Sequence, residues 1–208
     1  MKFDLHIHSK YSKDSMTSPE TILKVAKKRG LDGIAVTDHN TIKGGVLTNK
    51  INSDNDFVVV IGTEIRTEYG DIIGLFIQNE IISKDFKNVV YDIKKQGGLV
   101  VLAHPCRKFL TYPNNVLDNI DLIEAFNARS HQIHNLNALN LAKINKKPMT
   151  AGSDSHIPIE IGSGRLLMDE FNKQRLLDMD NTLEGEESNY YFVHGSSVLI
   201  EKFKGYIK

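Results

Sequence analysis

The 208-residue sequence predicts an α/β fold in which the sheet closes into a TIM-like barrel with helices outside. Apolar, strand-like runs alternate with helical patterns, and a short polar motif follows nearly every run. Such alternation is typical of a parallel sheet, either open and doubly wound or closed as a barrel. An open sheet gathers its ligands at one switch point, whereas a barrel gathers them around its rim. The spread of the polar motifs therefore favours the barrel.

The first quarter of the chain predicts two strands and two helices. The opening KFDLHIH is a strand that ends in polar residues, and Ser18 before Pro19 marks the start of a helix over about 19–29. GIAVT at 33–37 is the second strand. A polar helical stretch follows at about 43–53.

The middle of the chain predicts three strands and one helix. The run FVVVIG from Phe57 is continuously apolar, as in strands buried on both faces, and Glu64 stands just beyond its end. GDIIGLFI at 70–77 is a further strand. A helix over 83–96 is closed by two glycines, and LVVLA at 99–103 is the next strand.

The last part of the chain has weaker patterns. Residues 121–126 and 148–151 predict short strands on either side of a helix over 130–146. The acidic stretch 178–189 predicts a loop, and 190–193 predicts a late strand.

Composition limits the classes of function. Lys plus Arg equals Asp plus Glu at 26 each, so no global field attracts nucleic acid or an anionic membrane. No apolar run approaches the roughly 20 residues that span a bilayer, and the single Cys106 agrees with a reducing compartment. We expect a cytoplasmic protein with one domain over 1–208, its motifs within about 1–165, and a less defined part at 170–208.

The polar motifs together offer a set of metal ligands. His6 and His8 are separated by one residue on a strand, so both imidazoles can reach one ion. Alone, such a pair is more often incidental, and Asp38 alone is as readily a helix cap. A carboxylate at Glu64 is costly to bury unless it is paired or binds metal, and it could bridge two cations. The candidate ligands are His6, His8, Asp14, His39, Glu64, Asp71, His104, Asp154 and His156.

This set exceeds what one tetrahedral zinc ion needs. Its nitrogen and oxygen donors without thiolate suit zinc, manganese or iron, so we expect two or three divalent ions. A close pair of ions can ionise a bridging water near neutral pH and hold both oxygens of a displacement at phosphorus. The set therefore predicts metal-dependent hydrolysis.

At these residues the sequence resembles the PHP family, named for polymerase and histidinol phosphatase, and is most similar to its small stand-alone phosphoesterases. The motifs that carry the resemblance occur in order, as DLHIHSKYSKDS, GLDGIAVTDHNT, IGTEI, GDIIGLF, VVLAHP and GSDSH. The resemblance implies a distorted seven-stranded barrel with up to three metal ions.

The resemblance also implies how the ligands are shared. The implied sets are His6, His8, Glu64 and Asp154 for one ion, Glu64 and His104 for a second, and Asp14, His39 and His156 for a third. Asp71 stands where many family members carry a metal-binding histidine. It would ligate through oxygen or leave the second ion more weakly bound. The chain also has little room after Cys106 for the insertion common in nucleotide-hydrolysing relatives, so substrate recognition could be simpler or more open.

Four basic residues near the motifs are candidates to bind phosphate oxygens, namely Arg107, Lys108, Arg129 and Arg165. Arg107 follows the HP motif and Arg129 follows the strand ending in EAFNA, so these two are expected nearest the barrel mouth. For each residue a surface salt bridge is about as expected as a substrate role. Asp154 or His156 would transfer protons.

Two further features are expected to be structural. His131 and His134 have helical spacing, but no carboxylate joins them, so we expect no metal there. Cys106 has no evident base partner and is expected to be a packing residue.

These observations predict a metal-dependent phosphoesterase in which a metal-activated hydroxide hydrolyses a small phosphate ester. The substrate class is a phosphomonoester, a nucleotide or a short oligonucleotide, without stable binding of duplex nucleic acid and without a membrane partner. Two alternatives stay open: an amide hydrolase that uses the same site, and a non-catalytic, metal-stabilised module.

Overall fold

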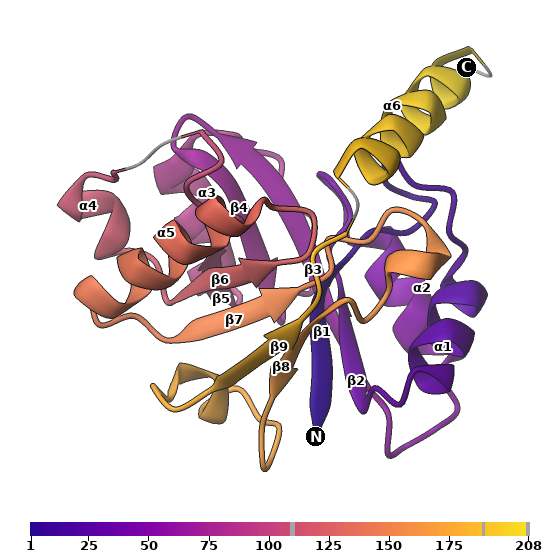
Figure 1. The fold of residues 1–208 in the computed structure, drawn as a ribbon, viewed down its shortest axis with the longest axis horizontal. Helices are drawn as coiled ribbons and strands as arrows, with labels where there is room; N and C mark the ends of the chain where they lie inside the picture. The colour runs from indigo at the N-terminus through magenta and orange to yellow at the C-terminus, as the bar shows by residue number, and fades with distance from the viewer. Residues whose placement is uncertain (109–110, 189, 207–208) are drawn as a thin grey trace.

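The computed structural model describes residues 1–108, 111–188 and 190–206, without the side chains of 190–193 and 206. The described chain is a mixed α/β fold built around one nine-stranded sheet (Figure 1). Its elements are β1 (Lys2–Ile7), α1 (Pro19–Lys28), β2 (Gly33–Val36), α2 (Lys43–Ile51), β3 (Val58–Thr67), β4 (Gly70–Leu75), α3 (Phe86–Lys95), β5 (Leu99–Leu102), α4 (Asn114–Leu117), β6 (Leu122–Asn127), α5 (Gln132–Ile144), β7 (Met149–Gly152), β8 (Gly164–Leu167), β9 (Thr182–Gly185) and α6 (Tyr190–Tyr206), with short 3₁₀ turns at Pro158–Glu160 and Arg175–Leu177.

The strand order is β7-β6-β5-β4-β3-β2-β1-β8-β9. Strands β1, β2 and β3 are parallel neighbours, as are β5, β6 and β7. Strand β4 is antiparallel to both of its neighbours, and so is β8. The expected alternation of strand and helix is therefore interrupted, because β3 turns directly into β4 through Glu68 and Tyr69 and no helix lies between them.

The sheet curls into a nearly closed barrel. Beyond β7, Ser155 forms a parallel bridge with Ile7 of β1, and the Ser155 carbonyl accepts a hydrogen bond of 2.9 Å from the His8 amide. The backbones approach closely at this seam: a Cβ atom on Gly152 would lie 2.3 Å from Cβ of His6. The seam thus brings the motif that follows β7 next to the motif at the end of β1.

The expectation of seven strands was wrong, because β8 and β9 extend the sheet beyond β1. Strand β9 lies inside the expected loop at 178–189, and its Leu183 packs on the core while its backbone pairs with β8. The expected strand at 190–193 is instead the start of the 17-residue helix α6. A short aromatic run has strand propensity, but here the helix continues through it.

The predicted helices form where expected. Helix α1 begins at Pro19, and the Ser18 hydroxyl accepts a hydrogen bond from the Thr21 amide as an N-cap. One core cluster draws on strands around the sheet, including Phe3, Val60 and Val101, and two others join the sheet to the outer helices. Among the described residues, no helix combines the length and apolar character needed to cross a membrane.

Candidate metal centre

All nine predicted ligands lie at one end of the barrel. They come from β1, β3 and β4 and from the segments that follow β1, β2, β5 and β7. Glu64 lies within β3, paired with Ile73 of β4, so its expected place beyond the strand end was wrong; the strand continues to Thr67 as the partner of β4. The ligand atoms form four overlapping groups: His8, Asp14, His39 and His156; His6, His104 and Asp154; His6, His8 and Glu64; and Glu64, Asp71 and His104.

The first two histidines point at one another. Their Nε2 atoms lie 3.1 Å apart, and Oε2 of Glu64 lies 3.3 Å from each. Oδ1 of Asp154 lies 3.6 Å from Nε2 of His6 and 3.4 Å from Nε2 of His8. Two imidazole nitrogens and two carboxylate oxygens therefore converge on one point, which is a suitable donor set for a divalent ion such as zinc.

Glu64 connects the groups. Besides its contacts with His6 and His8, its Oε2 lies 3.2 Å from Nδ1 of His39, and its Oε1 lies 2.8 Å from Nε2 of His104. The side chain is buried. Burial opposes ionisation, but the imidazoles of His39 and His6 hold the pKa of Glu64 well below its usual range. Glu64 is thus a carboxylate that can bridge neighbouring cations.

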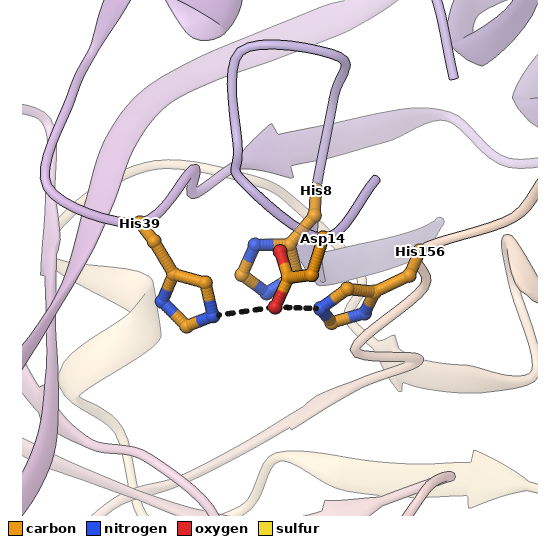
Figure 2. A group of neighbouring side chains, drawn as sticks. All are labelled: His8, Asp14, His39 and His156. Atoms are coloured by element: carbon orange, nitrogen blue, oxygen red, sulfur yellow. Dashed lines mark ion pairs between the residues drawn. The ribbon is translucent and has the colours of Figure 1, made fainter. Parts of the chain in front are cut away.

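A second group surrounds Asp14 (Figure 2). Its Oδ2 lies 3.3 Å from Nε2 of His39 and 3.1 Å from Nε2 of His156, and the ring of His8 packs on His156 with centroids 4.2 Å apart. The other oxygen, Oδ1, is buried and has no hydrogen-bond partner in the described part of the chain. Buried polar atoms are rarely left unsatisfied, so the Asp14 carboxylate fits a bound cation.

Asp71 is shared between this centre and a basic side chain. Its Oδ2 lies 4.0 Å from Nε2 of His104. Arg66 donates Nε to Oδ1 at 2.9 Å and Nη2 to Oδ2 at 3.0 Å. Both carboxylate oxygens are therefore engaged by a guanidinium beside the ligand group.

The surroundings of His8 and His156 shift the pKa values of these two imidazoles in opposite directions. Burial lowers the pKa of His8, but the carboxylates of Asp154 and Glu64 outweigh it and raise that pKa to about 9. Burial and the neighbouring His8 lower the pKa of His156 to about 4. His156 is therefore held in the neutral form that ligates metal, whereas His8 must lose a proton to do so.

Sequence reasoning missed Glu124, a buried carboxylate in β6. Its Oε1 lies 2.9 Å from Nδ1 of His6, and its Oε2 accepts hydrogen bonds from the His104 amide at 2.6 Å and from Asn127 Nδ2 at 3.0 Å. Carboxylates that hold the second nitrogen of a ligating histidine are characteristic of metal sites. A signal was present, since Glu124 interrupts an apolar strand as Glu64 does.

The two favoured arginines have different environments. Arg129 is buried and donates to Oε1 of Glu160 and to Oγ of Ser197, each at 2.8 Å, and its Nη1 lies 2.8 Å from Nδ1 of His156. Arg107 is partly exposed, with Nη2 donating to Oδ2 of Asp154 at 3.0 Å.

Lys108 lies beside the ligand groups. Together with Arg107 it lines a cavity of about 140 Å³, whose other lining residues include Arg66, Asp71, His104 and Tyr112. Arg165 of β8 pairs with Glu184 of β9. His131 and His134 contact each other edge to face and join no carboxylate in any ligand group of the described residues. Cys106 is buried, as expected of a packing residue.

Asp38 joins none of the ligand groups in the described part of the chain, and it does not cap helix α2. Helix α2 begins after Ile42. The Asp38 carboxylate instead accepts hydrogen bonds from the Ser9 amide at 2.6 Å and the Ser9 hydroxyl at 2.7 Å. It fixes the start of the loop that follows β1.

Two sequence relatives come from Methanocaldococcus jannaschii, and both are uncharacterized proteins. One is 43% identical over 161 residues, which is 71% of this chain and 93% of the relative. The other is 32% identical over 190 residues, covering 86% of this chain and 75% of the relative.

Several solved structures share the fold. A two-domain Bacteroides vulgatus protein containing a predicted PHP-like metal-dependent phosphoesterase has a TM-score of 0.76 and 19% identity, over 89% of this chain but only 65% of its own. A candidate metal-dependent phosphoesterase from Bifidobacterium adolescentis has a TM-score of 0.62 and 18% identity, over 75% of this chain and 88% of its own. An amidohydrolase from Chromobacterium violaceum has a TM-score of 0.64 and 15% identity, over 93% of this chain and 96% of its own.

Two family models match the sequence directly. The PHP domain model matches residues 4–149, and this range includes seven of the nine clustered candidate ligands. The PHP-associated model matches residues 132–182. With this match and a relative at 43% identity, the chain belongs to the PHP domain family.

Proposed function

We propose that the protein hydrolyses a small phosphate ester by means of two or three divalent ions at the barrel end. One observation carries the proposal: the buried Glu64 carboxylate lies within 3.3 Å of the imidazole nitrogens of four histidines, which are His6, His8, His39 and His104. A carboxylate surrounded by imidazoles provides ligands for cations, and because Glu64 contacts histidines of several ligand groups it is suited to lie between adjacent ions.

The donors favour zinc, manganese or iron. The first ion would be held by His6, His8, Glu64 and Asp154, the second by Glu64, His104 and Asp71, and the third by Asp14, His39 and His156. Such ions supply Lewis acidity, and they activate water for attack at phosphorus.

The chain's own side chains supply the rest of the chemistry. Arg107 is a partly exposed guanidinium beside Asp154 and is suited to anchoring phosphate oxygens. Arg129 is buried against Glu160 and His156, so it orients His156 rather than reaching the substrate. Asp154 contacts both the histidine pair and Arg107, and it can accept a proton beside the bound phosphate.

The substrate class is a small phosphorylated molecule. The cavity beside His104 and Asp71 has a volume of about 140 Å³, which is small beside ligand sites in general, and three of its lining residues are basic. A phosphomonoester or the end of a nucleotide or short oligonucleotide fits this size and charge. The neutral net charge argues against tight binding of duplex nucleic acid.

Amide hydrolysis is the second candidate, because the amidohydrolase from Chromobacterium violaceum has the same fold. A non-catalytic, metal-stabilised module is the third. The test is a screen of the manganese- and zinc-loaded protein on phosphomonoesters, phosphodiesters, short oligonucleotides and N-acyl amino acids, with His8→Ala and Asp154→Ala beside it. We expect ester turnover that both variants lose. Turnover of amides alone would support the second candidate, and bound metal without turnover the third.

A further inference from the structure

The C-terminal helix α6 lies at the end of the barrel opposite the N-terminus (Figure 1). From this helix, the ammonium group of Lys204 donates hydrogen bonds to three backbone carbonyls, those of Lys10 at 2.7 Å and of Ser12 and Ser15 at 2.6 Å each. These carbonyls belong to one loop, between β1 and α1. These three loop carbonyls therefore surround an ammonium group that lies 189 to 194 residues away in the sequence.

The same loop carries Asp14. Ser12 Oγ lies 3.2 Å from Nδ1 of His8 and accepts a hydrogen bond from the His39 amide at 3.0 Å. Ser15 Oγ contacts the carbonyl oxygens of His8 and His156, at 2.9 Å and 2.8 Å. The loop thus touches every histidine of the Asp14 group, and its conformation sets where those ligands meet.

Three carbonyl oxygens that converge on one point repel one another unless a positive charge lies between them. An ammonium group has three donors on one tetrahedral nitrogen and can meet all three oxygens. A guanidinium has planar donors in a fixed fork and cannot replace it in this geometry. The loop conformation therefore depends on an ammonium group at position 204.

Helix α6 also reaches the other side of the Asp14 group. Ser197 accepts a hydrogen bond of 2.8 Å from Nη2 of Arg129, whose Nη1 lies 2.8 Å from Nδ1 of His156. An exposed ion pair of 2.8 Å between Lys13 and Glu201 joins the helix to the loop again. The contacts from this one helix thus act on Asp14 and on His156.

We propose that Lys204 is a positioning residue that assembles the Asp14, His39 and His156 ligand set by holding the loop at its three carbonyls. This inference rests on the proposed function, because it assigns one element of the fold to one ion of the centre. The ligands of the ion at His6, His8, Glu64 and Asp154 come mainly from the barrel strands and their ends, and of these four residues His8 is the one that the loop contacts, through Ser12 and Ser15.

The test is the metal content of the full-length protein, measured by mass spectrometry after equilibrium dialysis against a series of manganese or zinc concentrations. Lys204→Met keeps the aliphatic stem and removes the donors. We expect one bound ion to become about ten- to a hundredfold weaker and the others to keep their affinity. Lys202→Met, an exposed lysine on the same helix, is the matched control and should bind as the wild type does.

Chemical rescue separates a lost contact from a misfolded chain. Methylammonium can occupy the space between the three carbonyls in a Lys204→Ala variant and should restore the weakened ion, whereas Lys204→Arg should stay defective. Wild-type metal affinities in Lys204→Met would overturn the inference, as would equal weakening of all ions or a failure of methylammonium to restore binding. Absence of metal in the wild-type protein would instead refute the proposed function.

Discussion

Oε1 of Glu124 lies 2.9 Å from Nδ1 of His6, and this contact orients the imidazole so that Nε2 faces His8 and Glu64. The same carboxylate accepts a hydrogen bond from the backbone amide of His104. One buried side chain that is not itself in a ligand group therefore fixes two histidines of the centre.

Replacing this carboxylate tests its role. Glu124→Gln keeps the shape but removes the charge that favours a proton on Nδ1 of His6, so we expect about ten- to a hundredfold weaker metal binding. Metal titration followed by calorimetry measures the change. Asp118→Asn, an exposed substitution near the same strand, is the control. Unaltered affinity in Glu124→Gln would show that the contact is incidental.

The Arg66–Asp71 ion pair predicts two effects of opposite sign. Because Arg66 engages both oxygens of Asp71, Arg66→Gln should leave the carboxylate available and strengthen binding of the ion at His104 and Glu64. Asp71→Asn should weaken the same ion. Arg66 is largely exposed, so the gain should not exceed about fivefold. Competition with a metal-sensitive dye measures both variants, and weaker binding in Arg66→Gln would contradict this reasoning.

Arg129 and Arg107 should differ when they are replaced. Arg129→Met leaves the buried Glu160 carboxylate without its charged partner, and we expect a loss of about 3–5 kcal/mol in the free energy of unfolding. Arg107→Gln should change stability much less and should raise KM for a phosphate ester. Urea denaturation and steady-state kinetics distinguish them. A stable Arg129→Met protein with only a raised KM would instead place Arg129 in the substrate site.

Metal binding should depend steeply on pH. The pKa of His8 is raised to about 9 by Asp154 and Glu64 against the effect of burial, so near neutral pH this imidazole holds a proton that an incoming ion must displace. Apparent affinity should therefore rise with pH, approaching tenfold per unit for this proton, and level off above about 9. Calorimetry in buffers of different ionisation enthalpy counts the released protons. Affinity that is constant between pH 6 and 8 would be inconsistent with a protonated His8.

The sequence predicted which residues lie close together better than it predicted the strands that carry them. The candidate ligands stand in short motifs, most of them at strand ends, and barrel geometry brings such ends together, so nine separated residues could be grouped without coordinates. The strand β9 could not be predicted, because Thr182–Gly185 has little hydrophobic pattern and forms by pairing with β8. The contact of Lys204 with residues 10–15 was also hidden, since it depends on where helix α6 lies.

The role of Glu64 is the central claim, because this carboxylate contacts a histidine of every proposed metal position. The most direct measurement is the number of metal equivalents bound by Glu64→Gln beside the wild type, with phosphate ester turnover measured on the same samples. We predict that the variant loses more than one equivalent and that turnover falls at least a hundredfold. Full metal content with wild-type turnover in Glu64→Gln would contradict a hydrolytic centre built around this residue.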